Sequence, residues 1–277
     1  MWKMRKIVGL IIIIGVFSTA CSEFRKAQKS ADWRLKYEVA LEYYNQKDYY
    51  KAVALFEEIL PFVKTEKEGE TVLFYYAYCY YHYKNQYLLA SHYFTNFYQT
   101  YNRSELAQEA YYMAAYCLYL DAPLYNLDQS SSKEAISSMQ NFLNRYPTSE
   151  YAEKATEVID ELQVKLELKA YENSKQYFKL SKFKSAVIAF QNFEKEYPDS
   201  DYIEEIRYLK IDSQFNLAKL SIYTKQKERY MGAIEFYEKF IDRYPKSQYL
   251  RDAESIFEET QSELRKLAKL EKNYSNL

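Results

Sequence analysis

Glycine and proline are scarce in this chain, whose 277 residues include four Gly and five Pro. Sheet sandwiches need these residues at frequent turns, and phosphate-binding loops need clustered glycines. Gly9 and Gly15 lie in an N-terminal apolar run, so the rest of the chain contains two glycines, Gly69 and Gly232. The scarcity excludes a Rossmann or P-loop enzyme and favours an all-helical protein.

An excess of one charge sign is also missing. The chain carries 38 Lys and Arg against 39 Asp and Glu, a net charge of −1. Three of the basic side chains stand in residues 1–20, and the other residues mix both signs. A nucleic-acid binder would concentrate basic residues in one region, so we expect no nucleic acid as a partner. Apolar residues make up 48% of the chain and aromatic ones 18%, including 33 Tyr, which is enough for a packed core.

Histidine is almost absent, and recognisable catalytic patterns are missing. His82 and His92 lie ten residues apart without a Cys or carboxylate at ligand spacing. No Gly-x-Ser-x-Gly elbow and no Cys–His pairing of known context is present. We therefore expect no metal, no cofactor and no enzymatic activity. A peptidoglycan or glycan enzyme, the alternative, would need a clustered acid pair in a cleft.

The N-terminus has the pattern of a secretory signal. Three basic residues precede the apolar run Ile7–Phe17, which is too short to span a bilayer, and small residues follow it. Cys21 after Ala20 resembles the lipobox of bacterial lipoproteins, with Phe17 where that family usually has Leu. The resemblance implies cleavage between Ala20 and Cys21 and acylation of Cys21. An ordinary signal peptide with an incidental Cys is the alternative.

Two further cysteines, Cys79 and Cys117, lie 38 residues apart in aromatic segments of helical pattern. The periplasm permits disulfides. Thiols on packed helices more often act as small buried hydrophobes, and we expect that role here. Ser22 follows Cys21. In enteric bacteria an Asp at this position resembles an inner-membrane retention signal, so its absence favours the outer membrane.

A repeat organises the remainder of the chain. An Ala is followed four residues later by a large apolar residue and seven residues later by another, five times over. Three copies end in Tyr-Pro-x-Ser, at 146–149, 197–200 and 244–247. Pro ends a helix, and the Ser can cap the next one. The predicted packing residues are Ala52, Phe56, Ala90, Phe94, Ala135, Phe142, Ala186, Phe190, Ala233 and Phe240.

An upstream partner helix has its own pattern. Ala40 and Tyr43 precede Ala52 by the offsets at which Ser174 and Tyr177 precede Ala186. This spacing is similar to the tetratricopeptide (TPR) pattern. We predict an all-α, TPR-like superhelical solenoid of about five helical hairpins plus a C-terminal capping helix. Its boundaries are a lipoprotein signal peptide at 1–20, a tether at 21–32, repeats at 33–273 and a disordered tail at 274–277.

The Ala-to-Ala spacings exceed the TPR length of 34 residues. We expect the excess in two lengthened loops, Asp121–Ser132 and Thr224–Met231, and in long connecting helices such as Glu150–Lys169. The Glu-, Lys- and Arg-rich segment Gln248–Leu270 is predicted to form the polar cap that a solenoid needs at its end.

Tyrosine predicts a binding surface. In the TPR family fixed positions of the first helix of each pair face the inner wall. Counting those positions from the alanines brings several tyrosines together there, with Cys79 and His82 among the positions of the second pair. Tyr offers flat apolar area and a hydroxyl at low entropy cost, which suits an extended peptide; simple helix packing is the alternative. The candidate groove residues are Tyr37, Tyr44, Tyr75, Tyr83, Tyr112, Tyr116 and Tyr119.

A lipobox followed directly by such repeats resembles the BamD (ComL/YfiO) family of outer membrane lipoproteins. The resemblance rests on Tyr76-Ala77-Tyr78 with Leu89-Ala90 in one repeat, and on Tyr111–Ala115 with Leu127-Asp128-Gln129 in the next. It extends from Cys21 to about Ala268. Asn102 replaces the usual Pro, and the charged contact positions of characterised relatives are not recognisable in repeat four.

The resemblance implies a non-catalytic component of the β-barrel assembly (BAM) complex at the periplasmic face of the outer membrane. It implies docking on the POTRA domains of BamA through the C-terminal repeats, contacts with other subunits, and a groove for unfolded outer membrane protein segments. The alternative is another TPR outer membrane lipoprotein that acts as a scaffold for cell-envelope factors.

Overall fold

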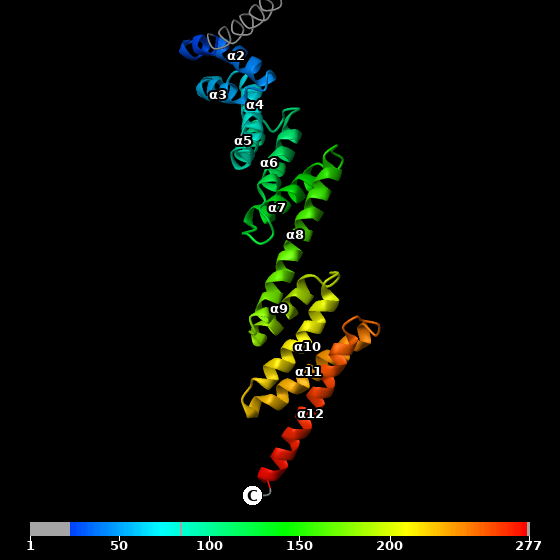
Figure 1. Cartoon of the computed structure of the whole chain (residues 1–277). Helices are drawn as coiled ribbons and strands as arrows, with labels where there is room; N and C mark the ends of the chain where they lie inside the picture. The colour runs from blue at the N-terminus through cyan, green and yellow to red at the C-terminus, as the bar shows by residue number, and fades with distance from the viewer. Residues whose placement is uncertain (1–22, 84, 276–277) are drawn as a thin grey trace, which may run out of the picture. The chain divides into compact units, whose positions relative to one another are not determined.

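The computed structural model describes residues 23–83 and 85–275, and within them the chain forms helices and no strand (Figure 1). Consecutive helices pack against one another along the chain. The prediction of an all-α, TPR-like solenoid is confirmed. The helices are α2 (Trp33–Asn45), α3 (Tyr49–Val63), α4 (Gly69–His82), α5 (Tyr87–Thr100), α6 (Ala107–Asp121), α7 (Ser130–Arg145), α8 (Ala152–Lys179), α9 (Phe183–Glu196), α10 (Ile203–Lys219), α11 (Tyr223–Arg243) and α12 (Leu250–Ser275).

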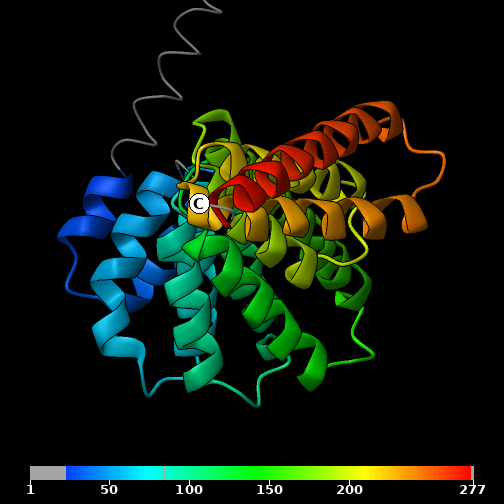
Figure 2. The same cartoon turned by 90° about the horizontal axis from the view of Figure 1, so that it is seen from below.

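The chain divides into two compact units, with the boundary between Leu162 and Gln163. The first unit contains α2–α7 and the beginning of α8. Its helices lie side by side in chain order (Figure 2). The second unit contains the rest of α8 and then α9–α12, where α10 packs against α9, α11 and α12. Each unit buries its own apolar clusters.

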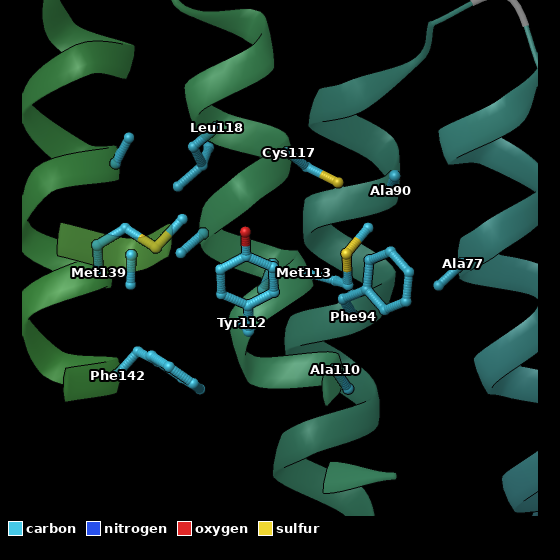
Figure 3. Packing of buried hydrophobic residues seen from close by; sticks show 14 of the residues in the cluster. Ala77, Ala90, Phe94, Ala110, Tyr112, Met113, Cys117, Leu118, Met139 and Phe142 are labelled. Carbon is cyan, nitrogen blue, oxygen red and sulfur yellow. The ribbon is translucent and has the colours of Figure 1, made fainter. Parts of the chain in front are cut away.

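The repeated alanines lie in the apolar clusters between neighbouring helices. Each of the five is buried, and so is the aromatic residue predicted to share its face. Figure 3 shows this arrangement around Ala90 and Phe94, beside Met139 and Phe142 of the next pair. A methyl group occupies little space between two backbones, so the larger rings fill the surrounding volume at native density. Cys117 lies in the same cluster and Cys79 in the one before it, both as free, buried thiols.

Each Tyr-Pro-x-Ser segment forms the same joint between pairs. The backbone N–H of Tyr146 donates to the carbonyl of Phe142, and Ser149 Oγ accepts the backbone N–H of Tyr151 at 3.1 Å. Tyr151 then stacks on Tyr112, with ring centroids 4.6 Å apart. The joints at 197–202 and 244–249 repeat these contacts, including the stacks of Tyr202 on Tyr171 and Tyr249 on Tyr208.

The sequence reasoning missed that the joint ends in a second tyrosine. Ser caps the turn before the helix rather than the helix itself, because Ser200 lies two residues before Tyr202, the N-cap of α10. The motif is therefore Tyr-Pro-x-Ser-x-Tyr. Its first ring packs on the preceding helix, as Tyr146 does on Phe142 at 5.6 Å. Its last ring packs on the first helix of the preceding pair.

One loop prediction was wrong. Residues 224–231 belong to α11, which runs unbroken from Tyr223 to Arg243. The segment contains no Gly or Pro and consists largely of good helix formers, so nothing ends the helix there. The other lengthened loop is present between α6 and α7. The excess length elsewhere lies in α8, which has 28 residues, and in the part of α11 that precedes Ala233.

Part of the predicted tether is folded. Residues 23–29 are helical and pack along α2, with Ala27 buried and the Phe24 ring 5.9 Å from that of Tyr43. Lys36 Nζ donates to the carbonyl of Gln28 at 3.2 Å. The signal peptide and Cys21 lie outside the described residues, as do residues 276–277 of the predicted tail.

Candidate peptide-binding surface

Half-buried tyrosines from the first helices of successive pairs meet in the first unit. We call this surface the tyrosine face. Tyr44 of α2 lies with its ring centroid 4.6 Å from that of Tyr75 of α4, and Tyr116 lies 5.6 Å from Tyr119 on α6. Tyr78 and Tyr81 of α4 lie between them, 6.1 Å apart. The face consists of Tyr44, Tyr75, Tyr78, Tyr81, Tyr116 and Tyr119.

A carboxylate lies at the centre of this face. The hydroxyl of Tyr78 donates a hydrogen bond to Glu109 of α6. Burial raises the pKa of Tyr78, and the hydrogen bond to Glu109 raises it further. Burial also raises the pKa of Tyr44. These phenols are therefore protonated donors at any physiological pH, and each presents a neutral ring.

A second carboxylate lies at the α6 end of the face. Tyr119 donates its hydroxyl to Glu161 of α8 at 2.5 Å, and this hydrogen bond is the main reason that its pKa rises to about 12. The Lys154 ammonium lies 5.6 Å from the ring centroid of Tyr116, within range of a cation–π interaction.

His82 borders the face at the end of α4. Its ring stacks on Tyr49 of α3, with centroids 4.6 Å apart, and lies 6.0 Å from Tyr78. Burial lowers the pKa of His82, and the nearby Lys47 lowers it further, so the imidazole is neutral at pH 7. The face thus combines neutral aromatic rings with two carboxylates.

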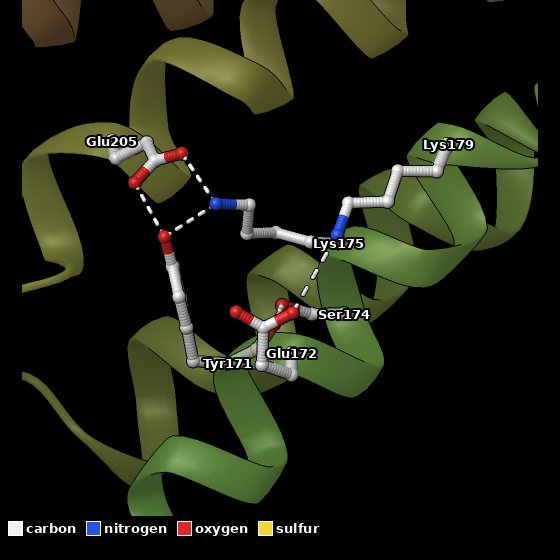
Figure 4. Close-up of polar contacts among 6 residues, drawn as sticks. All are labelled: Tyr171, Glu172, Ser174, Lys175, Lys179 and Glu205. Atoms are coloured by element: carbon white, nitrogen blue, oxygen red, sulfur yellow. Dashed lines mark hydrogen bonds and ion pairs between the residues drawn. The ribbon is translucent and has the colours of Figure 1, made fainter.

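The second unit places a charged link at the equivalent position. Tyr78 and Lys175 occupy the same register position of α4 and α8, and each contacts a Glu in the first turn of the next first helix. Lys175 Nζ lies 2.7 Å from Glu205, which also accepts the Tyr171 hydroxyl at 2.5 Å (Figure 4). Lysine at this position makes the second unit's link ionic, so the aromatic surface is a property of the first unit.

Comparison with family models gave a match for nearly the whole repeat region. The model described as YfiO, outer membrane lipoprotein, matches residues 30–202 and again residues 163–274. The chain belongs to the YfiO family of outer membrane lipoproteins. The two matches overlap at 163–202, as an internal repeat leads one to expect. A search of curated proteins gave no match.

The structure of this YfiO-family chain brings four of the seven predicted groove residues together on the tyrosine face: Tyr44, Tyr75, Tyr116 and Tyr119. Tyr37 packs against the same apolar cluster as Tyr44 and Tyr75, but no ring contact joins it to the described tyrosines of the face. Tyr83 is the C-cap of α4, and its ring lies 5.8 Å from Tyr50 at the turn.

Tyr112 needs a correction, because its side chain is 3% exposed and cannot line an open wall. Its ring lies between Tyr116 at 5.5 Å and Tyr151 at 4.6 Å, and it also contacts Phe142. Its hydroxyl is buried without a hydrogen-bond partner among the described residues. Tyr112 supports Tyr116 from behind.

Tyr78 was missed because one residue is inserted in a turn, whereas Glu109 was missed because the groove prediction named tyrosines alone. Ala77 is the buried counterpart of Ala40, but it precedes Ala90 by 13 residues, whereas Ala40 precedes Ala52 by 12. Counting back from Ala90 therefore selected Cys79, which is fully buried, in place of Tyr78. Counting from the small residue within α4 would have selected Tyr78 and Tyr81, although it would have replaced Tyr75 with the buried Phe74.

The described residues contain neither a metal-ligand cluster nor a helix suited to crossing a membrane. No three His, Cys, Asp or Glu side chains among residues 23–83 and 85–275 are grouped as a metal site requires. The described helices also include none whose length and hydropathy would let it cross a bilayer.

Proposed function

We propose that this YfiO-family chain is a non-catalytic component of the outer membrane β-barrel assembly complex. It is attached to the periplasmic face of the outer membrane by acylation of Cys21. It docks on the POTRA domains of BamA through its second unit. The tyrosine face receives an extended segment of an unfolded outer membrane protein and holds it for insertion.

The observation that carries this proposal is the family match over residues 30–274, which places the chain among outer membrane lipoproteins. The tyrosine face supports the client-binding step. Its rings supply apolar contact area, and Glu109 and Glu161 supply acceptors for backbone N–H groups or basic side chains of a passing segment. Recognition of this kind needs neither a cofactor nor an energy source.

The second unit offers a surface for docking. An open groove of about 760 Å³ follows α11, and Met231 and Ile234 lie in it between Lys227 and Glu235. Met231 is exposed, and methionine adapts to partner surfaces of irregular shape. Apolar centres with charged rims are typical of protein interfaces.

Copurification tests the assembly role. The acylated chain, extracted from membranes in mild detergent, should copurify with a large barrel protein that carries POTRA domains. Charge reversal in the α11 groove, by K227E with E235K, should reduce that recovery, while the same exchange of the exposed pair Lys266 and Glu263 on α12 should not. Reproducible absence of the barrel would favour the alternative scaffold role.

A peptide-binding measurement tests the tyrosine face. Y116A with Y119A should weaken binding of an unfolded outer membrane protein segment about thirtyfold, since each of the two aromatic contacts contributes on the order of 1 kcal/mol. The matched control is Y177A, which removes an exposed ring from the second unit. Fluorescence anisotropy measures the affinity, and a thermal melt verifies folding. Equal binding by the folded double variant would contradict the assignment of the face.

A further inference from the structure

One edge of the first unit exposes large apolar side chains, and we call it the apolar edge. It consists of the turns within the helix pairs, between α2 and α3, α4 and α5, and α6 and α7. The first two of these turns are in contact, since Tyr49 stacks on His82 and Tyr50 lies 5.8 Å from Tyr83. The exposed large apolar residues lie among exposed polar ones at 45–47, 126 and 128. They are Tyr50, Leu88, Leu89, Leu124, Tyr125 and Leu127, with exposed fractions from 37% to 74%.

The opposite edge, formed by the turns between the pairs, is polar. Its exposed positions are Lys, Thr and Glu in 64–67, Asn102 and Arg103 after α5, and Pro147 and Thr148 after α7. Phe62, near the end of α3, is the exposed large apolar residue on that side. Turn positions are ordinarily polar, so it is the apolar edge that needs an explanation.

The longest of the apolar turns is held in shape by a buried amide. Gln129 Nε2 donates to the carbonyl of Leu124 at 2.8 Å and to that of Leu127 at 3.1 Å. Its Oε1 accepts the hydroxyl of Ser132 at 2.7 Å, and Gln129 itself is 4% exposed. Buried polar contacts therefore hold this loop in a shape that exposes two leucines. Selection for solubility alone would favour the opposite arrangement.

The N-terminal segment brings the start of the chain to this same edge. Residues 23–29 run antiparallel to α2, because Phe24 lies beside Tyr43 near the end of α2 while Gln28 lies beside Lys36 near its beginning. Glu23 therefore lies at the end of α2 that leads into the first apolar turn. Cys21, the proposed site of acylation, stands two residues before Glu23.

We propose that the apolar edge of the first unit rests on the phospholipid bilayer that holds the anchor. The inference rests on the proposed acylation of Cys21, which fixes the acyl chains within two residues of this edge. Leucines and tyrosines at turn tips are suited to the boundary between headgroups and acyl chains. The contact is shallow, and it fixes the rotation of the first unit about its tether.

Fluorophores attached to single cysteines test the contact. L88C and L124C place the fluorophore NBD on the apolar edge, and N102C and T148C place it on the polar edge. Cys79 and Cys117 are fully buried, so the introduced thiol is the one labelled. The acylated protein is reconstituted in vesicles of phosphatidylethanolamine and phosphatidylglycerol that contain a nitroxide-labelled lipid. Labels at 88 and 124 should shift to the blue and be quenched, while those at 102 and 148 should resemble the label in water.

Partitioning of the unacylated chain gives a second measurement. In a Cys21→Ser background, L88D, L124D and L127D together should lower the vesicle partition coefficient about tenfold or more. T65D, N102D and T148D place the same charge on the polar edge and should have little effect. Far-ultraviolet circular dichroism verifies that both triple variants fold.

The outcomes separate the edge from the anchor. Labels at 88 and 124 that remain water-like on vesicle-bound protein overturn the proposal, and so do labels that shift only when another membrane protein is added, because that protein then covers the edge. If the purified protein lacks acyl chains but its edge labels still shift, the anchor proposal fails and the bilayer contact stands.

Discussion

One side chain decides whether the link between the first helices of two successive pairs is neutral or ionic. At one register position the first unit has Tyr78 and the second has Lys175, and each contacts a glutamate of the next pair. The tyrosine leaves a neutral aromatic surface, whereas the lysine forms an ion pair. This substitution distinguishes a surface suited to a peptide from one that holds its own helices together.

The ion pair of the second unit should have a definite pH signature. Burial opposes ionisation of Glu205, but hydrogen bonds from Lys175 and Tyr171 outweigh it and hold the pKa of the carboxyl below its ordinary value. Stability from a lowered carboxyl pKa is present above the unfolded pKa and is lost as the pH falls through the folded one.

Lys175→Met should therefore lower the free energy of unfolding by about 1 kcal/mol at pH 7, discounted for partial exposure. The difference from wild type should shrink once the pH falls below about 4, the range in which carboxylates are protonated. Urea melts at a series of pH values measure it. Lys266→Met is the control, since Lys266 is largely exposed and lies 2.7 Å from Glu263 on α12. A difference that stays constant from pH 7 to pH 3 would rule out the ion pair as its cause.

At the scale of the element, the junction between α3 and α4 depends on a missing side chain. A Cβ on Gly69 would overlap the backbone carbonyl oxygen of Val63, which is not free to move. Gly232 in α11 is different, because a Cβ there would meet the end of the Gln214 side chain at 3.0 Å, and that side chain can shift.

Gly69→Ala should destabilise the protein by about 1–3 kcal/mol, the usual effect of overpacking. Gly232→Ala should be neutral or stabilising by up to about 1 kcal/mol, because alanine favours a helix interior. Thermal denaturation compares the two variants directly. A wild-type melting temperature for G69A would show that the chain can separate α3 from α4 without loss.

Elements of this fold follow from local pattern wherever the pattern is complete. Ala186 and Phe190 share a face by their spacing, and Pro198 ends α9 as expected. Tyr78 could not be found by counting across a turn of unknown length. The helix at 23–29 was missed for a different reason, since it depends on packing against α2 rather than on a repeat of its own.

At the scale of the whole molecule, a solenoid should respond locally to a defect, because each pair is stabilised through its neighbours. Ala186→Phe overpacks the cluster in which Ala186 and Phe190 of α9 pack with Tyr171 of α8, and it should cost about 1–3 kcal/mol. Amide hydrogen exchange should accelerate in α9 and α10 and stay unchanged in α2–α5.

Ser185→Phe is the matched control for that variant, since it adds the same ring at the neighbouring, exposed position of α9. It should leave exchange unchanged throughout. If A186F accelerated exchange equally in α2 and α9, the repeats would unfold as one cooperative body, contrary to the nearest-neighbour picture.

The Tyr-Pro-x-Ser-x-Tyr joint also affects how the number of hairpins can change in evolution. The joints after α9 and after α11 use the same residues in the same order. A deletion of residues 198–244 joins Tyr197 directly to Pro245 and recreates the motif, so one hairpin is lost while the connection keeps its contacts. Duplication across the same two points adds a hairpin equally well. Lineages can thus lengthen or shorten this protein by whole hairpins without having to invent a new linker.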